Sequence, residues 1–360
     1  MTKRIIALTS IVLSLTFVTV FVSCNDDDNN SSNDGTPQTS GNVYIAGSNG
    51  ESAVLWSNGQ GTIFPYETAY GVAVSGNEVY VIGSRDNQYC YWKAGQPETP
   101  IILEEHSSGP SLPPTLALPF MGNTFPTPLY GNAIAISGSD VYAGNTSTSS
   151  GYYWKNGQRV SLPDEGYTTG ITVSGNDVYM AGYTGTDGAY DAVYWKNGQK
   201  VVLANNASST GIVVSGNDVY VCGFTITGGS RANAVYWKNG QQITLSAQDV
   251  PEQSAYASAG SYATGIAVHG NDVYVCGNFV PTSNLWPSAV YWKNGQQIIL
   301  AAVDDSSGMM GAMTRGIAVS GNDVYVCGTT YSSGTSTAVY WKNGHKVELG
   351  TGVANAITIQ

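Results

Sequence analysis

The sequence predicts an all-β fold: a seven-bladed β-propeller of four-stranded antiparallel blades, with the ring closed by the C-terminal strand. One phrase recurs seven times along the chain, its spacing matches the length of a four-stranded blade, and the last segment supplies a strand that the first repeat lacks. The composition agrees with this fold. In 360 residues, a hydrophobic content of 42% is enough for a buried core, and 44 Gly with 24 Tyr favour strands joined by tight turns.

Two phrases define the repeat, GIAVSGNDVYVCG and AVYWKNGQ, which are separated by a variable gap and followed by an apolar triplet. The tyrosine of the first phrase occurs seven times, at Tyr44, Tyr80, Tyr142, Tyr179, Tyr220, Tyr274 and Tyr325. The tryptophan of the second phrase also occurs seven times, at Trp56, Trp92, Trp154, Trp195, Trp237, Trp292 and Trp341. The repeats are about 45 residues apart, which is the length of one propeller blade. Because the tryptophans keep one strand position, we expect them to pack between blades.

Each repeat contains four strand-like segments, of the types GIAV, DVYVCG, AVYWK and QQIIL, rich in β-branched and aromatic residues. The first two are joined by Gly-Asn, as at Gly216-Asn217, and the last two by Asn-Gly, as at Asn197-Gly198. These dipeptides accept the positive φ angles of two-residue hairpins. The first repeat lacks a GIAV segment, whereas the final segment 355–360 resembles the GIAV segment 132–137 of the third repeat. A C-terminal strand in the first blade would therefore close the ring.

The N-terminus has the pattern of an export signal. Lys3 and Arg4 precede an apolar run over 5–22, which ends at Ser23-Cys24 and is followed by the polar, acidic stretch 25–41. We expect a signal peptide over 1–23, a flexible tether over 24–41 and the propeller over 42–360. A plain secreted protein and a membrane-spanning anchor are the alternatives.

Three resemblances extend this interpretation. Ser23-Cys24 resembles the lipobox of bacterial lipoproteins, with Phe21 in place of the usual aliphatic residue, and this implies lipidation of Cys24. The stretch NDDDNNSSNDG resembles the acidic export tag of Bacteroidota lipoproteins, which implies a lipid-anchored location on the cell-surface side of the outer membrane. The GIAV and GNDVYV phrases resemble NHL-type and SBBP-type repeats, and the AVYWKNG phrase resembles HAF extracellular repeats. These repeat families imply the fold and host many functions.

The loops between the second and third strands, and between blades, vary in length and composition, whereas the hairpin turns are nearly invariant. We call the side of the disc that carries the variable loops the loop face, and the opposite side the hairpin face; the loop face is the candidate binding surface. Long loops are expected over 104–130, 246–264 and 304–315, and a shorter one over 278–288. The candidate ligand- or partner-binding residues in them are Phe120, Phe125, Tyr130, Tyr256, Tyr262, Trp286, Met309 and Arg315. The alternative is that these side chains form a plug over the channel mouth.

The charge and the reactive residues exclude several classes of function. Lys+Arg 14 against Asp+Glu 25 gives a net charge of −11, which argues against nucleic acid or an anionic lipid surface as the partner. Three His and five Cys do not form a recognisable metal site, so no metal, cofactor or disulfide is predicted. Cys222, Cys276 and Cys327 share one strand position at which other repeats have Ala or Ile, which indicates buried packing.

The sequence therefore predicts a surface-exposed outer-membrane lipoprotein with a non-enzymatic propeller, which touches the membrane only through its lipid anchor. Its expected partner is either a protein of an envelope complex or an extracellular glycan. The alternative is a carbohydrate-active hydrolase or lyase that uses acidic residues of the loop face, such as the pair Asp164-Glu165.

Overall fold

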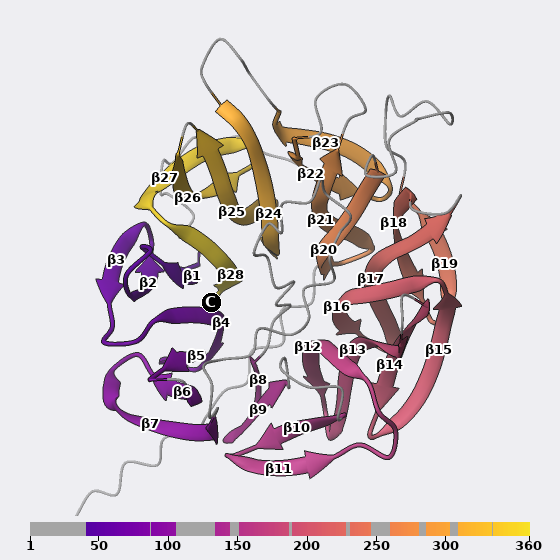
Figure 1. Cartoon of the computed structure of the whole chain (residues 1–360), viewed down its shortest axis with the longest axis horizontal. Helices are drawn as coiled ribbons and strands as arrows, with labels where there is room; N and C mark the ends of the chain where they lie inside the picture. The colour runs from indigo at the N-terminus through magenta and orange to yellow at the C-terminus, as the bar shows by residue number, and fades with distance from the viewer. Residues whose placement is uncertain are drawn as a thin grey trace, which may run out of the picture. The chain divides into compact units, whose positions relative to one another are not determined.

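The computed structural model describes residues 41–86, 88–105, 134–144, 151–186, 189–227, 231–245, 260–280, 286–302, 309–332 and 334–360. Within these ranges, 28 strands form seven four-stranded antiparallel sheets, arranged in a ring (Figure 1). We call the centre of this ring, which the innermost strands surround, the channel. The predicted fold class is confirmed. The described ranges contain no helix with the length and apolar character needed to cross a lipid bilayer.

Every blade runs from an innermost strand at the channel to an outermost strand at the rim (Figure 1). The innermost strands, in blade order, are β28 (Val353–Ile359), β4 (Thr68–Ser75), β8 (Ile134–Ser137), β12 (Tyr167–Ser174), β16 (Ala207–Ser215), β20 (Gly260–His269) and β24 (Met309–Ser320). The second strands are β1 (Val43–Ser48), β5 (Glu78–Arg85), β9 (Asp140–Gly144), β13 (Asp177–Thr186), β17 (Asp218–Thr227), β21 (Asp272–Val280) and β25 (Asp323–Ser332). The third strands are β2 (Ala53–Ser57), β6 (Gln88–Lys93), β10 (Tyr152–Lys155), β14 (Ala189–Lys196), β18 (Arg231–Lys238), β22 (Ser288–Lys293) and β26 (Thr335–Lys342). The outermost strands are β3 (Gln60–Ile63), β7 (Gln96–Glu105), β11 (Gln158–Ser161), β15 (Gln199–Asn205), β19 (Gln241–Thr244), β23 (Gln296–Ala301) and β27 (His345–Thr351).

The C-terminal strand closes the ring, as the sequence predicts. Strand β28 pairs antiparallel with β1, with Ile357 opposite Ile45 and Ile359 opposite Val43, so that blade 1 combines the two ends of the propeller. The backbone N–H of Gln360 donates to the carbonyl of Asn42 at 3.0 Å and extends this pairing by one step. The closure pairs the inner edge of β1, and β28 becomes the innermost strand of blade 1.

The hydrophobic core is divided among the seven interfaces between neighbouring blades, each of which contains one cluster of buried side chains. The repeat tryptophans are buried in these clusters, as expected. Trp195 of blade 4, for example, belongs to the cluster that also contains Leu162 of blade 3. Gly182 packs against the ring of this tryptophan. A Cβ added at Gly182 would collide with the carbonyl oxygen of Tyr167 and lie 2.8 Å from the Trp195 ring, so a larger residue does not fit there. The repeated glycine of the second strand therefore makes room for the tryptophan of the third.

Candidate functional site

The hairpin face is built from a repeated turn in which an asparagine connects two strands. In blade 4, Asn197 has a φ of 50°, its Oδ1 accepts a hydrogen bond from the Val178 N–H at 2.9 Å, and its Nδ2 donates to Asp177 at 2.6 Å. Lys196 Nζ lies 2.9 Å from the same carboxylate. Bonds from Lys196 and Asn197 hold the pKa of Asp177 below its usual value. This carboxylate therefore stabilises the turn through its bonds to Lys196 and Asn197.

The same arrangement recurs around the ring. Five blades place an aspartate against the lysine and asparagine of the turn, at Asp140, Asp177, Asp218, Asp272 and Asp323. Blade 2 differs because Ala94 replaces the asparagine. There the longer Glu78 takes the place of the aspartate and reaches Lys93 at 2.6 Å and the Tyr80 hydroxyl at 2.7 Å. We call these six groups the turn carboxylates; the pKa of each is lowered.

A ring of β-bulges surrounds the channel. In six blades the pairing between the innermost strand and its neighbour skips one residue near the middle of the innermost strand, and β24 has a second skip, at Met310 near its start. The residues skipped at the shared position, which we call the bulge ring, are Tyr70, Thr169, Thr210, Thr264, Arg315 and Asn355. A bulge turns one side chain out of the regular alternation of a strand. The innermost strands of six described blades therefore each carry one bulged residue at the equivalent strand position.

Most members of the bulge ring bind the next blade. The Thr169 hydroxyl donates to the Ser209 carbonyl at 2.9 Å, and the Thr210 hydroxyl donates to the Ala263 carbonyl at 2.9 Å. Asn355 Nδ2 donates to the Ala69 carbonyl at 2.9 Å, across the closure from blade 1 to blade 2. Each bond joins a bulged residue to the residue that precedes the next bulge. These side chains thus connect the inner walls of neighbouring blades.

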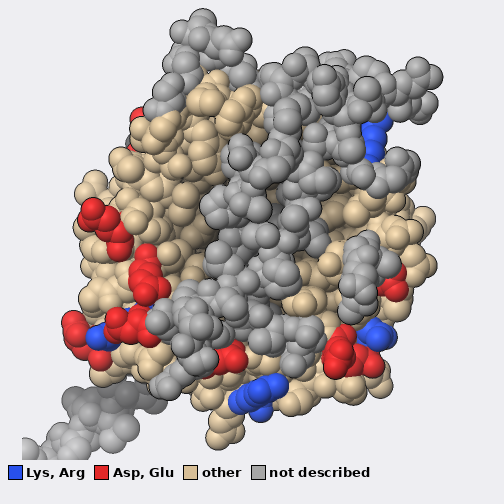
Figure 2. Space-filling model, in the orientation of Figure 1, with Lys and Arg blue, Asp and Glu red and all other residues tan. Residues whose placement is uncertain are grey.

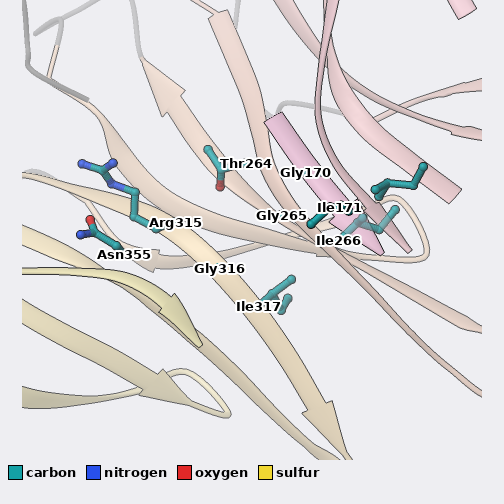
Figure 3. Close-up of a pocket in the computed structure, with 11 residues that line it drawn as sticks. Gly170, Ile171, Thr264, Gly265, Ile266, Arg315, Gly316, Ile317 and Asn355 are labelled. Atoms are coloured by element: carbon teal, nitrogen blue, oxygen red, sulfur yellow. The ribbon is translucent and has the colours of Figure 1, made fainter. Parts of the chain in front are cut away.

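A small pocket that opens to solvent lies at the level of the bulge ring (Figure 3). Its wall consists of Gly-Ile steps from β12, β16, β20 and β24, together with the bulged Thr264, Arg315 and Asn355. The glycines bring the backbone close to the second strand: a Cβ added to Gly265 would lie 3.1 Å from Cys276 Sγ. The pocket is therefore apolar along the isoleucines and polar where the bulged side chains from β20, β24 and β28 meet.

Arg315 carries the only charge among the described residues that line this pocket. It occupies the bulge position at which blades 4, 5 and 6 have threonine, and it is 8% exposed. Figure 3 shows its side chain beside that of Asn355, with both projecting in the same direction from the neighbouring strands β24 and β28. A cation in a recess of low solvent exposure interacts more strongly with an anion than one on the surface does. This corner of the pocket therefore carries the positive charge of its described wall.

Two further groups lie on the loop-face side and were not predicted from the sequence. In blade 3, Tyr152 donates from its hydroxyl to Glu104 Oε2 at 2.7 Å, and the guanidinium carbon of Arg159 lies 3.7 Å from the centre of its ring. In blade 4, three tyrosines pack together at Tyr167, Tyr183 and Tyr190. The sequence offered one signal for the first group, because Tyr152 stands where five of the other repeats have valine and the second has Cys90.

The predicted site residues fall into two sets. Cys24, Phe120, Phe125, Tyr130 and Tyr256 lie outside the described residues. Tyr262 is 2% exposed and packs edge-to-face on Phe224 at 5.2 Å between ring centres. Trp286 is half-buried two residues before the start of β22, and Met309 is half-buried at the first position of β24.

The loop assignment of three of these residues is wrong. Tyr262 lies in β20, and Met309 and Arg315 lie in β24, because the innermost strands continue past the bulge towards the loop face. Glu104 likewise lies in β7. The structure brings Arg315 into the channel pocket, whereas Tyr262, Trp286 and Met309 do not line it.

The described cysteines, Cys90, Cys222, Cys276 and Cys327, are buried and free. Burial raises the pKa of the Cys276 thiol to about 11. The described residues contain no group of three His, Cys, Asp or Glu side chains that could hold a metal ion. On the face drawn in Figure 2, the charged side chains of described residues lie mainly towards the rim and gather into no basic patch.

No known family model matches the sequence, and no curated protein matches it. Among solved structures, the chain is similar to a puromycin hydrolase complexed with PGG, with a TM-score of 0.51 at 10% identity over 86% of this chain and 51% of that one. A puromycin-hydrolysing peptidase of Mycobacterium tuberculosis follows with a TM-score of 0.48 at 10% identity over 84% and 50%. A polysaccharide lyase bound to a glucuronate–rhamnose sulfate unit has a TM-score of 0.46 at 10% identity over 80% and 86%. The chain spans about half the length of the two puromycin-hydrolysing proteins, and the likeness shows a shared propeller fold alone.

Proposed function

We propose that the chain is a binding module whose propeller takes a ligand or partner at the loop-face mouth of its central channel. The observation that carries this proposal is the pocket inside the ring, where three members of the bulge ring, Thr264, Arg315 and Asn355, lie beside an otherwise apolar wall of Gly-Ile steps. Concave sites with an apolar wall and a few converging polar groups are typical of ligand binding. The turn carboxylates are engaged with lysines at the hairpin face, and no carboxylate occurs among the described residues of the pocket wall. This distribution favours binding over acid–base catalysis.

The proposal includes the cell-surface location that the sequence indicates. The lipobox-like Ser23-Cys24 and the acidic stretch after it support a lipid anchor at Cys24 and a tether that holds the propeller away from the outer membrane. In that setting the partner is a protein of an envelope complex or an extracellular glycan. Both would approach the loop face without contact between the propeller and the bilayer.

The test is the capture of a partner by the full-length lipoprotein, purified from its native membrane in mild detergent and also probed on glycan arrays. Two variants make a matched pair within blade 7. Met310, at the loop-face end of β24, and Val347, on the outermost strand β27, are each 36% exposed. We expect Met310→Arg to reduce capture and Val347→Arg to leave it unchanged. Equal behaviour of the two variants, or no captured protein or glycan at all, would contradict the proposal.

A polysaccharide hydrolase or lyase is the second candidate function, and one observation favours it. The bond from the Tyr152 hydroxyl to Glu104, with the Arg159 guanidinium over the same ring, places an acid–base pair beside a cation. Turnover of uronic and neutral polysaccharides by the wild type, abolished by Tyr152→Phe and by Glu104→Gln, would support this candidate. Activity that survives both substitutions would exclude this group as the catalytic site.

A further inference from the structure

We infer that Tyr167, Tyr183 and Tyr190 form a sugar-stacking site at the loop-face end of blade 4, with a pyranose ring as the ligand group. The inference rests on the proposed binding function and names the chemical class of the ligand. We call the three residues the tyrosine array. The array crosses three neighbouring strands of the blade (Figure 1): Tyr167 begins β12, Tyr183 lies opposite it on β13, and Tyr190 is the second residue of β14.

The three rings hold one another in place. Those of Tyr167 and Tyr183 stack with 4.9 Å between their centres and 20° between their planes, and Tyr190 meets Tyr183 edge-to-face at 5.2 Å and 75°. The central Tyr183 is 6% exposed, whereas the two outer residues are half-buried and keep part of their surface accessible. Rings that are already oriented lose little side-chain freedom when the C–H face of a sugar packs on them.

Smaller residues occupy the equivalent positions of other blades. The strand pairing aligns Tyr167 with Thr68 of blade 2, and it aligns Tyr190 with Ala232 of blade 5. Blades 2 and 5 form the same four-stranded sheet with these smaller side chains. The blade architecture therefore does not require the two outer rings of the array, and a binding role explains why blade 4 carries them.

The side of blade 5 that faces the array supplies polar groups. Ala192 of β14 and Val235 of β18 pack in the cluster between blades 4 and 5. Tyr190 and Asn233 each lie two residues earlier on the same sides of these strands, towards the loop face. Asn233 Nδ2 donates to the Thr227 hydroxyl at 2.9 Å. An amide and a hydroxyl can bond to sugar hydroxyls, whereas the hot spot of a protein interface needs desolvated surroundings, so this polar edge favours a sugar.

The experiment measures binding of cellohexaose, mannohexaose, laminarihexaose and hexagalacturonate to the full-length protein in detergent, by calorimetry and saturation-transfer NMR. Tyr190→Ala and Tyr167→Thr introduce the residues of blades 5 and 2. The matched control is Tyr194→Ala, which removes a half-buried tyrosine from the same side of β14, four residues nearer the hairpin face. We expect at least one hexasaccharide to bind, with affinity reduced about threefold to tenfold by each array variant and unchanged by the control. Tyr190→Phe, which keeps the ring, should bind more tightly than Tyr190→Ala.

Unchanged affinity in both array variants, an equal loss in Tyr194→Ala, or no binding of any of the four probes would overturn the inference. A protein partner that Tyr190→Ala no longer captures, with no hexasaccharide bound, would also overturn it and would assign the array to a protein contact. In all these cases the proposed function still stands if Met310→Arg lowers partner capture. Should Tyr190→Ala fail to fold, Tyr167→Thr and Tyr190→Phe decide the question, since loss of affinity in Tyr167→Thr alone supports the site.

Discussion

The asparagine turns allow a quantitative test, because Asn197 combines a left-handed backbone with two side-chain hydrogen bonds. Asn197→Gly keeps the backbone conformation and removes both bonds. The lost bond to the Val178 N–H is worth about 0.5–1.5 kcal/mol, and the added freedom of glycine in the unfolded chain about 0.4–1 kcal/mol. The exposed bond to Asp177 adds little. We therefore expect the free energy of unfolding to fall by about 1–2.5 kcal/mol.

Asn197→Ala separates the two contributions. Alanine loses the same hydrogen bonds and must also adopt a φ of about 50°, which costs a residue with a Cβ about 1–2 kcal/mol. We expect Asn197→Ala to destabilise the propeller more than Asn197→Gly. Urea unfolding, followed by tryptophan fluorescence, measures the free energy of unfolding of both variants. An unchanged m-value shows that their unfolding midpoints can be compared directly. An alanine variant as stable as the wild type, or more stable than the glycine variant, would refute the assigned role of the turn.

Three further predictions concern the whole ring. The turn carboxylates have folded-state pKa values below those of the unfolded chain, so their stabilisation is complete above about pH 5 and is lost as the pH falls through the folded values. The melting temperature should drop over that range, and it should drop less steeply in Asp177→Asn. Gly182→Ala should destabilise strongly, by collision with the Tyr167 carbonyl and Trp195, whereas Gly95→Ala, with nothing within 4 Å, should be neutral in the same melting assay. The four described thiols should not react with a thiol reagent until the protein unfolds, because they are buried and the pKa of Cys276 is raised to about 11; rapid labelling of the native protein would contradict this.

The architecture could be predicted because repetition turns a weak local signal into seven aligned copies. The closure was predictable for the same reason: segment 355–360 resembles another innermost strand, and β28 takes that place in blade 1. The position of each strand within a blade was not predictable, since all four strand types are rich in apolar residues. The two faces of the disc could be predicted from the turn dipeptides alone. The positive φ of Asn197 agrees with the two-residue hairpin turn that the Asn-Gly dipeptide predicts.

The candidate site was predicted less completely. Arg315 was identified as a candidate but was assigned to a loop, because a bulge depends on the register between two strands and leaves no clear mark in the sequence of one. Asn355 was assigned only to closure. Its contact with Ala69 joins residues from the two ends of the propeller, and nothing local to either residue indicates such a contact.

The ring closure also determines how the protein would respond to mechanical force. The chain enters the propeller through β1, which is paired with β28 on one side and with β2 on the other. A pull on the chain before residue 41 therefore acts on a strand that is held along both edges, and it cannot strip an outer strand from the sheet. The C-terminal strand in this way reinforces the attachment point, and a molecule tethered at its N-terminus to a moving surface would resist extraction from the first blade.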